Sequence, residues 1–290
     1  AGKQVLVKFR ESTQKAWRDG LPLRHNPIVT PECKGDYRGS LVNLKPDTGY
    51  EIVLTLEGTD IRTVFRAATW SERFPVAAVV KCESGGSTLN VNQSGKADGY
   101  VLYDGTGSSI DTGNKSDVGI AVDASYVIIR GFTIKNVKQY GIRLLSGHHI
   151  VIEDCDISKC GSEEEKGFGF GYQGGIYSRP HNDLHAVIIQ RCKIHHPSWD
   201  SNSWAEKRGE SYHPGGPQTI VFRNSAGNHV IRYNEFWSDE DHYFNDVLGS
   251  GDNGSYRGFP GADSDIYCNY IANCWDDGIE AEGGDQNVRI

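Results

Sequence analysis

The chain has 290 residues, of which 38 are acidic and 30 basic, so its net charge is −8; its 35 glycines make up about 12% of the chain against a usual ~7%. No apolar run approaches the ~18–20 residues of a membrane span, and no basic tract indicates binding to nucleic acid. The glycines have no three-residue period, which excludes a collagen-like chain, and the apolar and aromatic content is too high for a disordered one. We therefore expect a soluble, turn-rich, all-β protein without membrane or nucleic-acid partners.

The N-terminal segment has the pattern of a small β domain. Residues 4–10 alternate apolar and polar side chains, as a half-buried strand does. Further strands are predicted within residues 40–58 and 61–69. We therefore assign residues 1–75 to a small β-sandwich.

Four residues of this segment form a signature. Leu44, Pro46, Thr48 and Tyr50 stand two residues apart. This run resembles the fibronectin type III family, which carries a tyrosine corner. The resemblance implies a spacer domain that has no chemistry of its own. It also implies that two strands precede Ala1, so that the sandwich is incomplete; a different small β-sandwich is the alternative.

A repeat begins at about residue 98. Its units lie at residues 124–137, 147–160, 184–197, 227–239, 263–274 and 285–290. Aligning them gives a first column of Ile129, Ile152, Ile189, Ile231, Ile266 and Ile290. A second column, five residues later, holds Ile134, Ile157, Ile194, Phe236 and Ile271. A third column between them holds Phe132, Cys155, Cys192, Asn234 and Asn269, and its asparagines predict an internal ladder. The first-column spacings of 23, 37, 42, 35 and 24 residues indicate a solenoid.

These units resemble the right-handed parallel β-helix of the pectin-lyase-like superfamily. The resemblance covers residues 98–290 and implies an all-β solenoid, with residues 76–97 as its linker or start. Because Ile290 falls mid-repeat at an inward position, we expect the β-helix to continue beyond it, as part of a larger modular chain. Such a fold does not by itself fix an activity.

The seven cysteines lack the close paired spacing of a zinc site, and we predict no metal ligands from the sequence. Cys155 and Cys192 share a column, so they are expected to stack as thiols in adjacent coils ~4.8 Å apart, with a disulfide as the alternative. Cys33 and Cys82 form an alternative pair.

Three coils exceed the basic unit of about 23 residues. The excess lies at residues 161–174, 195–218 and 238–254, at one turn position, so the three loops are predicted to form a wall along a groove. Their aromatic rings and acids suit sugars, since rings stack on pyranose faces and carboxylates accept from hydroxyl groups; the alternative is a satellite core that caps the coils. The candidate substrate-binding residues are Tyr172, Tyr177, Arg179, Trp199, Trp204, Tyr212, His213, His242, Tyr243 and Glu282.

The candidate catalytic residues are Asp246, Asp276, Asp277 and Glu280. Hydrolysis of a glycosidic bond needs two carboxyl groups, and burial and mutual repulsion would raise the pKa of the one that acts as acid. The segment Trp-Asp-Asp-Gly is similar to the paired-aspartate segment of the polygalacturonases, but their other signature segments are not recognisable, so no catalytic residue is carried over. Acids beside glycine are also common turn formers.

Other functions remain open. A lyase would need a cation such as calcium to neutralise a uronate, with Lys207, Arg179 or His213 as partner. A non-catalytic carbohydrate-binding module would need only the aromatic rings, and a phage-type receptor-binding protein is a further alternative. The sequence favours a hydrolase of a plant or algal cell-wall polysaccharide that is secreted, periplasmic or on the cell surface.

Overall fold

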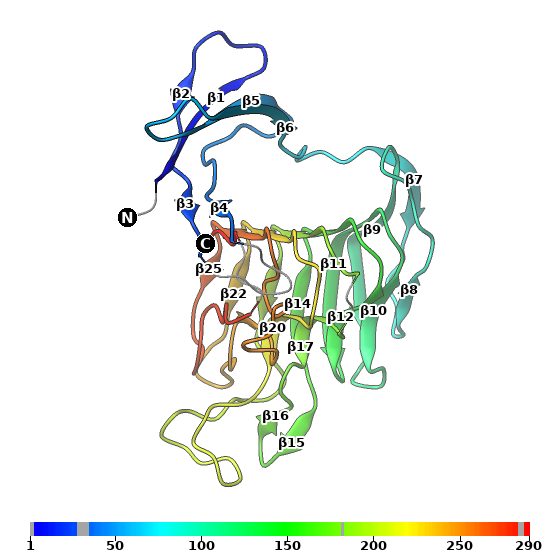
Figure 1. Ribbon diagram of the computed structural model, residues 1–290. Helices are drawn as coiled ribbons and strands as arrows, with labels where there is room; N and C mark the ends of the chain where they lie inside the picture. The colour runs from blue at the N-terminus through cyan, green and yellow to red at the C-terminus, as the bar shows by residue number, and fades with distance from the viewer. Residues whose placement is uncertain (1–2, 28–34, 181–182, 284–286) are drawn as a thin grey trace. The chain divides into compact units, whose positions relative to one another are not determined.

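The computed structural model describes residues 3–27, 35–180, 183–283 and 287–290. In these residues the chain consists of strands, turns and loops. None of the described segments forms a helix with the length and apolarity that crossing a bilayer requires. The contacts divide the chain into two units, Ala1–Phe74 and Pro75–Ile290 (Figure 1), which are described separately.

The N-terminal unit contains an antiparallel sheet in the order β2–β1–β5–β6. Its strands are β1 (Val5–Glu11), β2 (Arg18–Asp19), β5 (Gly49–Leu56) and β6 (Arg62–Ala68), and a separate ribbon joins β3 (Arg24–His25) to β4 (Tyr37–Arg38). Val7, Phe9, Tyr50 and Ile52 alternate along β1 and β5 and form the core. The Tyr50 hydroxyl accepts a hydrogen bond of 2.8 Å from the Lys45 amide, which is the contact of a tyrosine corner.

The predicted strands of this unit are therefore present, but the second sheet of a sandwich is not shown. Within the described residues only the two-residue strands β3 and β4 lie outside the four-stranded sheet. Along β6, side chains on both faces are exposed, including Val64 and Phe65. The reason is that β6 is an edge strand with no second layer packed over it among the described residues.

The second unit is a solenoid in which successive coils contribute parallel strands to three faces (Figure 1). Face 1 consists of β8 (Leu89–Val91), β10 (Val118–Asp123), β12 (Tyr140–Ser146), β17 (Gly174–Ser178), β20 (Gln218–Phe222) and β23 (Leu248–Gly249). Face 2 consists of β7 (Val76–Lys81), the first parts of β9 (Tyr100–Asp111) and β11 (Val127–Val137), then β13 (Ile150–Glu153), β18 (Val187–Gln190), β21 (Val230–Arg232) and β24 (Asp265–Tyr267). Face 3 consists of the second parts of β9 and β11, then β14 (Asp156–Cys160), β19 (Lys193–His195), β22 (Glu235–Trp237) and β25 (Tyr270–Ile271).

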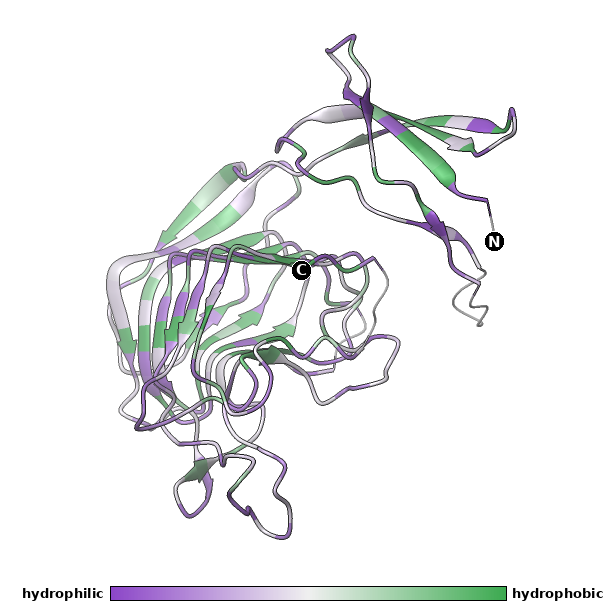
Figure 2. Cartoon of the chain, turned by 90° about the vertical axis from the view of Figure 1, so that its left-hand side faces the viewer, coloured by the Kyte–Doolittle hydropathy of each residue, from purple (hydrophilic) through white to green (hydrophobic). Residues whose placement is uncertain are grey.

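The register of the stack confirms the aligned columns. On face 2, Ile129 pairs with Ile152, which pairs with Ile189, and the column continues to Ile231 and Ile266. The second column is likewise in register along face 3. Five of the six first-column residues are buried, whereas Ile290, which was also predicted to face inward, is 72% exposed. Figure 2 shows residues of similar hydropathy forming bands across neighbouring strands. The core is therefore a set of apolar columns that run along the solenoid axis.

The corner before face 2 has the same backbone conformation in successive coils. The residue that enters this face has a φ of 53–60° in Tyr126, His149, Ala186, Asn228 and Asp263. This left-handed conformation turns the chain sharply, at a cost that residues other than glycine rarely accept. Its repetition at one position shows that stacking of the coils imposes the turn.

The third column is buried and polar towards the C-terminus. Cys155 and Cys192 stack in adjacent coils as free thiols, and the Cys192 amide donates to the Asn234 side chain at 2.9 Å. The side-chain amide of Asn234 donates in turn to Asn269 at 2.9 Å, so the predicted asparagine ladder is confirmed. Cys33 lies outside the described residues, but Cys82 is a free thiol, so the alternative pairing of Cys33 with Cys82 is wrong.

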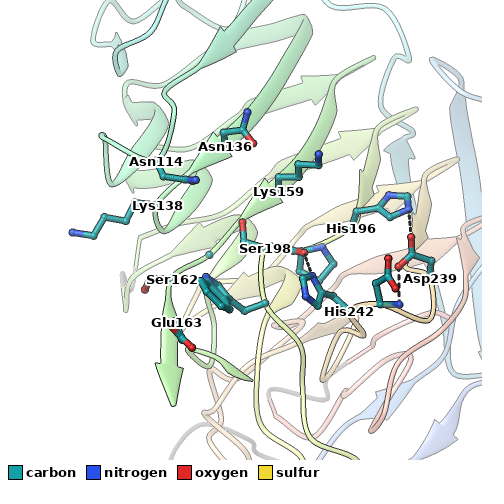
Figure 3. A pocket seen from close by; sticks show the side chains of 14 residues that line it. Asn114, Asn136, Lys138, Lys159, Ser162, Glu163, His196, Ser198, Asp239 and His242 are labelled. Carbon is teal, nitrogen blue, oxygen red and sulfur yellow. Dashed lines mark hydrogen bonds and ion pairs between the residues drawn. The ribbon is translucent and has the colours of Figure 1, made fainter. Parts of the chain in front are cut away.

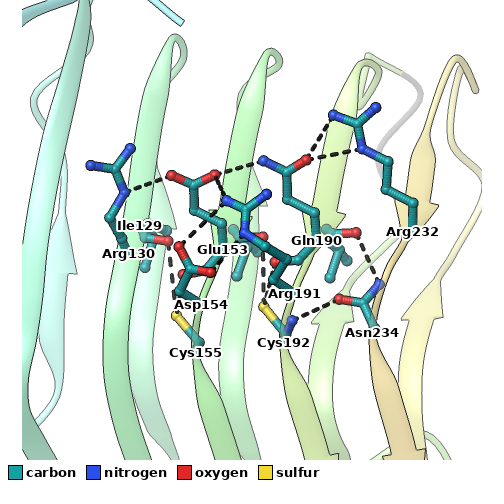
Figure 4. Close-up of polar contacts among 12 residues, drawn as sticks. Ile129, Arg130, Glu153, Asp154, Cys155, Gln190, Arg191, Cys192, Arg232 and Asn234 are labelled. Carbon is teal, nitrogen blue, oxygen red and sulfur yellow. Dashed lines mark hydrogen bonds and ion pairs between the residues drawn. The ribbon is translucent and has the colours of Figure 1, made fainter. Parts of the chain in front are cut away.

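A polar ladder follows face 2 beside these columns (Figure 4). Glu153 is 3% exposed, and its carboxylate accepts from Arg130 at 2.6 Å, from Arg191 at 2.7 Å and from the Gln190 amide at 2.6 Å. The Gln190 carbonyl oxygen accepts from Arg232 at 2.7 and 3.0 Å. A buried carboxylate is tolerated here because its oxygens are saturated with charged and neutral donors.

The long loops lie largely where they were predicted, with one correction. The first carries the hairpin of β15 (Glu163–Glu165) and β16 (Phe168–Gly169), and the second spans residues 196–217 (Figure 1). The third insertion was placed wholly before face 1, at residues 238–254. It is divided instead by β23, so that residues 250–264 lie on the other side of face 1. The short strand β23 occurs because Leu248 pairs with Ile220 and so continues its buried column.

Candidate functional site

Three predicted catalytic carboxylates gather at the C-terminal end of face 1. Asp246 precedes β23, and Asp276 and Asp277 occupy the same place in the next coil, where the Val247 amide donates to the Asp277 carbonyl at 2.9 Å. One carboxylate oxygen from each of the three acids lies within 4.8 Å of the others. The stacking of two coils thus brings together residues that are 30 positions apart in the chain.

Asp246 is the buried member of this acidic cluster, with 4% of its surface exposed. One carboxylate oxygen accepts from the side-chain amides of Gln218 and Asn245, and the other accepts from the Asp277 amide at 3.2 Å. Burial, followed by repulsion from Glu280, raises the pKa of Asp246 to about 7. The side-chain carbonyl oxygens of Gln218 and Asn245 have no hydrogen-bond partner, so both are free acceptors beside this carboxyl group.

Glu280 approaches Asp246 because the residue between them is glycine. A Cβ at Gly249 would lie 2.8 Å from the Glu280 carboxylate and 3.4 Å from the Asp246 Cβ. Glu280 accepts from the Asn253 side chain at 2.7 Å, and burial raises its pKa. A larger side chain at position 249 would push these two carboxyl groups apart, so Gly249 is a structural requirement of the site.

Two residues of the second insertion contact Asp276 of the acidic cluster. The His213 ring lies 3.7 Å from the Asp276 carboxylate, and Trp204 donates to the same group. The rings of Trp204 and His213 pack together with their centroids 4.9 Å apart, and Trp204 is 55% exposed. Burial raises the pKa of Asp276, while the facing His213 opposes that rise. An exposed indole therefore stands directly beside an acid of the cluster.

A cation and an aromatic ring border the cluster on the other side. Arg223 forms two hydrogen bonds of 2.8 and 2.9 Å with Asp252 and lies 5.1 Å from the centre of the Tyr172 ring. The hydroxyl group of Tyr172 contacts Gly251, where a Cβ would lie 1.8 Å from it. The Arg223 guanidinium holds the pKa of Asp252 below its usual range, so these two charges neutralise each other.

Two further predicted residues stand on face 1 in earlier coils. Tyr177 stacks on Tyr140 with ring centroids 4.5 Å apart, and Arg143 lies 5.5 Å from the centre of the Tyr140 ring. The Nε atom of Arg143 is buried without a hydrogen-bond partner. Arg179, in contrast, is exposed and donates to the Leu145 carbonyl at 3.3 Å. Face 1 therefore carries an aromatic and cationic strip that leads towards the acidic cluster.

Two other predicted residues, Trp199 and His242, line a different surface. They border a cavity of about 750 Å³ to which the bases of all three insertions contribute (Figure 3). His196 and Asp239 form an ion pair of 3.0 Å in its wall, and Lys138 and Lys159 also line it. The acids of the cluster are not among the lining residues, so the loops that were predicted to border one groove contribute to two separate surfaces.

The remaining predicted residues have lesser roles in the geometry. Tyr212 is exposed beside Lys207, whose amino group lies 5.9 Å from the ring centre. Tyr243 packs against Trp275 with centroids 4.7 Å apart, next to the acidic cluster in the chain. Glu282 is exposed, and its charge helps to raise the pKa of Glu280.

The stacked parallel faces agree with a comparison of the chain with protein families. A family described as the right-handed β-helix region matches residues 79–238, more than half of the chain. The chain belongs to the right-handed β-helix family. No curated protein and no solved structure matches it. Membership of the β-helix family accounts for the three faces and the columns, whereas the acidic cluster lies beyond the matched residues.

Sequence reasoning missed several residues of this β-helix site. Gln218, Asn245 and Asn253 contact the cluster through side-chain amides, and Asp252 neutralises Arg223. For Asn245 a signal existed, since it adjoins Asp246 in the sequence. Gln218 stands one coil before Asp246. Its contact with Asp246 could have been predicted only by aligning the strands of face 1 with one another, and long loops separate those strands in the sequence.

Proposed function

We propose that this protein hydrolyses glycosidic bonds of a polysaccharide at the acidic cluster. The observation that carries the proposal is the buried Asp246, whose pKa is raised to about 7 beside the carboxylates of Asp276 and Asp277. A carboxyl group that keeps its proton near neutral pH can protonate the leaving oxygen, and a neighbouring carboxylate can activate water or attack the sugar.

The cluster supplies both roles. Asp246 is the proposed general acid, and Asp277, the exposed member, is the proposed base or nucleophile. The carboxyl groups of Asp276 and Glu280 add negative charge to the site. This charge stabilises the positive charge that develops on the sugar ring in the transition state. The side-chain amides of Gln218 and Asn245 both donate to one oxygen of Asp246, so the proton of the acid form is carried by the other oxygen.

Exposed rings around the cluster supply the binding surface of this proposal. Trp204 and Trp275 are 55% and 38% exposed, and each lies next to an acid of the cluster. Tyr177 and Tyr172 extend the surface along face 1. Aromatic rings of this kind stack on the apolar faces of sugars, which suits a polymer better than a single small sugar. We infer a plant or algal cell-wall polysaccharide as the substrate.

A second candidate function is a calcium-dependent lyase of the pectin-lyase-like type. The three carboxylates within 4.8 Å of one another, together with the free carbonyl oxygens of Gln218 and Asn245, are the oxygen ligands that calcium prefers. A bound calcium ion would neutralise a uronate carboxylate and so acidify the adjacent proton. Among the predicted partners His213 lies closest to the acids, at 3.7 Å from Asp276.

The proposed function also implies where the protein acts. Because its substrate lies outside cells, we propose that the protein is secreted, periplasmic or bound at the cell surface. The N-terminal unit, with its tyrosine corner, is proposed to be a fibronectin-like spacer in a modular chain. A purely carbohydrate-binding module remains an outcome of the test below.

A polysaccharide panel tests the function directly. The chain is incubated with neutral and acidic cell-wall polysaccharides, with calcium or with a chelator, while reducing ends and ultraviolet absorbance of unsaturated sugars are followed. Reducing ends without unsaturation, unaffected by the chelator, are expected. Unsaturated products that disappear with the chelator would instead establish the lyase. Retarded migration in affinity gels without any product would show that the protein is a non-catalytic carbohydrate-binding module.

The pH dependence of turnover follows from the raised pKa of Asp246. A general acid with a pKa of about 7 is protonated below that pH, so kcat is expected to fall about tenfold for each pH unit above 7. Initial rates between pH 4 and 9 on the best substrate of the panel measure this limb. A rate that stays constant from pH 7 to 9 would exclude Asp246 as the general acid.

A further inference from the structure

A group of three histidines lies at the corner between faces 1 and 2, away from the acidic cluster. His148 and His149 enter β13, and His185 occupies the same corner one coil later, stacked on His148 with ring centroids 4.8 Å apart. One ring nitrogen from each of the three lies within 4.8 Å of the others. The group is not visible in the sequence because the coil that contains the first insertion places His185 36 positions after His149.

The tautomer of His185 leaves a nitrogen free. Its Nδ1 lies 2.7 Å from the Asp183 carbonyl oxygen, which can only accept, so Nδ1 carries the proton and Nε2 keeps its lone pair. A ring N–H bonded to a backbone carbonyl is the outer contact that orients metal-binding histidines.

His148 and His149 are also prepared to act as ligands. Both rings are half-buried, and each neutral imidazole has one ring nitrogen whose lone pair can bind a metal. Their Nδ1 atoms lie 2.9 Å apart, near the separation of about 3.3 Å that two nitrogens have in a tetrahedral shell with bonds of ~2.0–2.1 Å. Tyr126 stacks on His149 at 4.7 Å and holds its ring in place.

We propose that His148, His149 and His185 form a binding site for a divalent transition metal, with zinc as the best fit. Three neutral imidazoles are the ligands that zinc, nickel and copper prefer over calcium or magnesium. All three side chains are half-buried, so the fourth position faces solvent and can hold water or a ligand. For both Nδ1 atoms to bind the metal, the hydrogen held between them moves to the Nε2 atom of its own ring, so each imidazole keeps one N–H and stays neutral.

Titration of the metal-stripped full chain with zinc chloride, followed by calorimetry, tests the site. One equivalent is expected to bind, and the visible absorption of added cobalt is expected to have the intensity of a tetrahedral nitrogen site. His185→Phe preserves the ring stack on His148 but removes the ligand, so it is expected to lower zinc affinity by at least about 10–100-fold. His148→Phe provides a second variant with the same expectation, and circular dichroism of the metal-free forms verifies folding.

The chain offers a matched control. His195 and His196 are also adjacent, with their rings in contact, but His195 stacks on Trp237 and His196 meets that ring edge-on. Among the described residues they do not form a three-ligand group with a further histidine. His196→Phe is expected to bind zinc as the unmodified chain does. Asp277→Asn changes the other group of possible metal ligands, the acidic cluster, and is likewise expected to leave zinc binding unchanged. Absence of one-equivalent binding, or unchanged affinity in His185→Phe, would overturn the proposal. Loss of binding in His196→Phe or in Asp277→Asn would overturn it as well.

Discussion

Replacement of Asp246 by asparagine is expected to lower kcat by about 10²–10⁴-fold, which is the usual contribution of a general acid. The change preserves the size of the side chain, and the new amide oxygen can accept from Gln218 and Asn245 as the carboxylate does, while the new NH2 group faces the Asp277 amide. Binding of the polysaccharide is expected to remain. Initial rates and affinity gels on the same preparation separate the two effects, and an unchanged kcat would remove Asp246 from the reaction.

The same variant changes the dependence of stability on pH. The pKa of Asp246 is about 7 in the folded chain and near 4 when unfolded, so the folded state binds more protons between these values. Stability of the unmodified chain is therefore expected to fall as the pH rises from about 4 to 7, and this loss is expected to be smaller in Asp246→Asn. Melting temperatures at pH 5 and 8 measure it.

The exposed Glu240 provides the control for both measurements, because it lies in the same segment of chain. Glu240→Gln is expected to retain the rate and the pH dependence of melting. If Glu240→Gln shifted the melting curves as Asp246→Asn does, general charge rather than the buried carboxyl group would be responsible.

Replacement of Glu153 by alanine is expected to destabilise the solenoid by about 3 kcal/mol. The change leaves Arg130 and Arg191 without their shared carboxylate and orphans the Gln190 amide (Figure 4). Removing one partner of a buried ion pair costs about 3–5 kcal/mol, and the partial exposure of the two arginines, 38% and 46%, reduces this figure. For a unit of this size the melting temperature is expected to fall by roughly 6–12 °C.

Glu165→Ala is the matched control for this change. Glu165 pairs with Lys166 at 3.9 Å in an exposed hairpin, so its loss is expected to cost less than about 0.5 kcal/mol. Calorimetric melting of the three proteins compares the effects. Equal melting temperatures for Glu153→Ala and the unmodified chain would mean that the polar ladder contributes nothing to stability.

The repeat could be derived from the sequence because each buried column imposes a residue type at a fixed place in the coil. Ile129, Ile152 and Ile189 were aligned without any knowledge of the fold, and they pair directly in the sheet. The sequence also named Asp246 and Asp277 as candidate acids, but only the structure shows that their carboxylate oxygens lie within 4.8 Å of each other. Such a periodic pattern stays recognisable when long loops are inserted, because apolar side chains must fill the core in every coil.

The N-terminal unit was less predictable. Its strands alternate clearly, and Tyr50 forms the expected corner contact, but alternation shows only that one side of a strand is buried. It does not show what covers that side. The identity of the domain therefore depends on a second layer, which is not shown by the described residues.

The sequence by itself determined the all-β solenoid and its inward columns, and it named the candidate acids. Only the tertiary structure decided that β23 divides the third insertion, that Gly249 admits Glu280 beside Asp246, and that His185 joins His148 across a loop. The physical reason is that the core repeats with the coil, whereas the outer side chains meet neighbours from other coils. Those neighbours are set by the length and path of each loop, for which the periodic pattern holds no information.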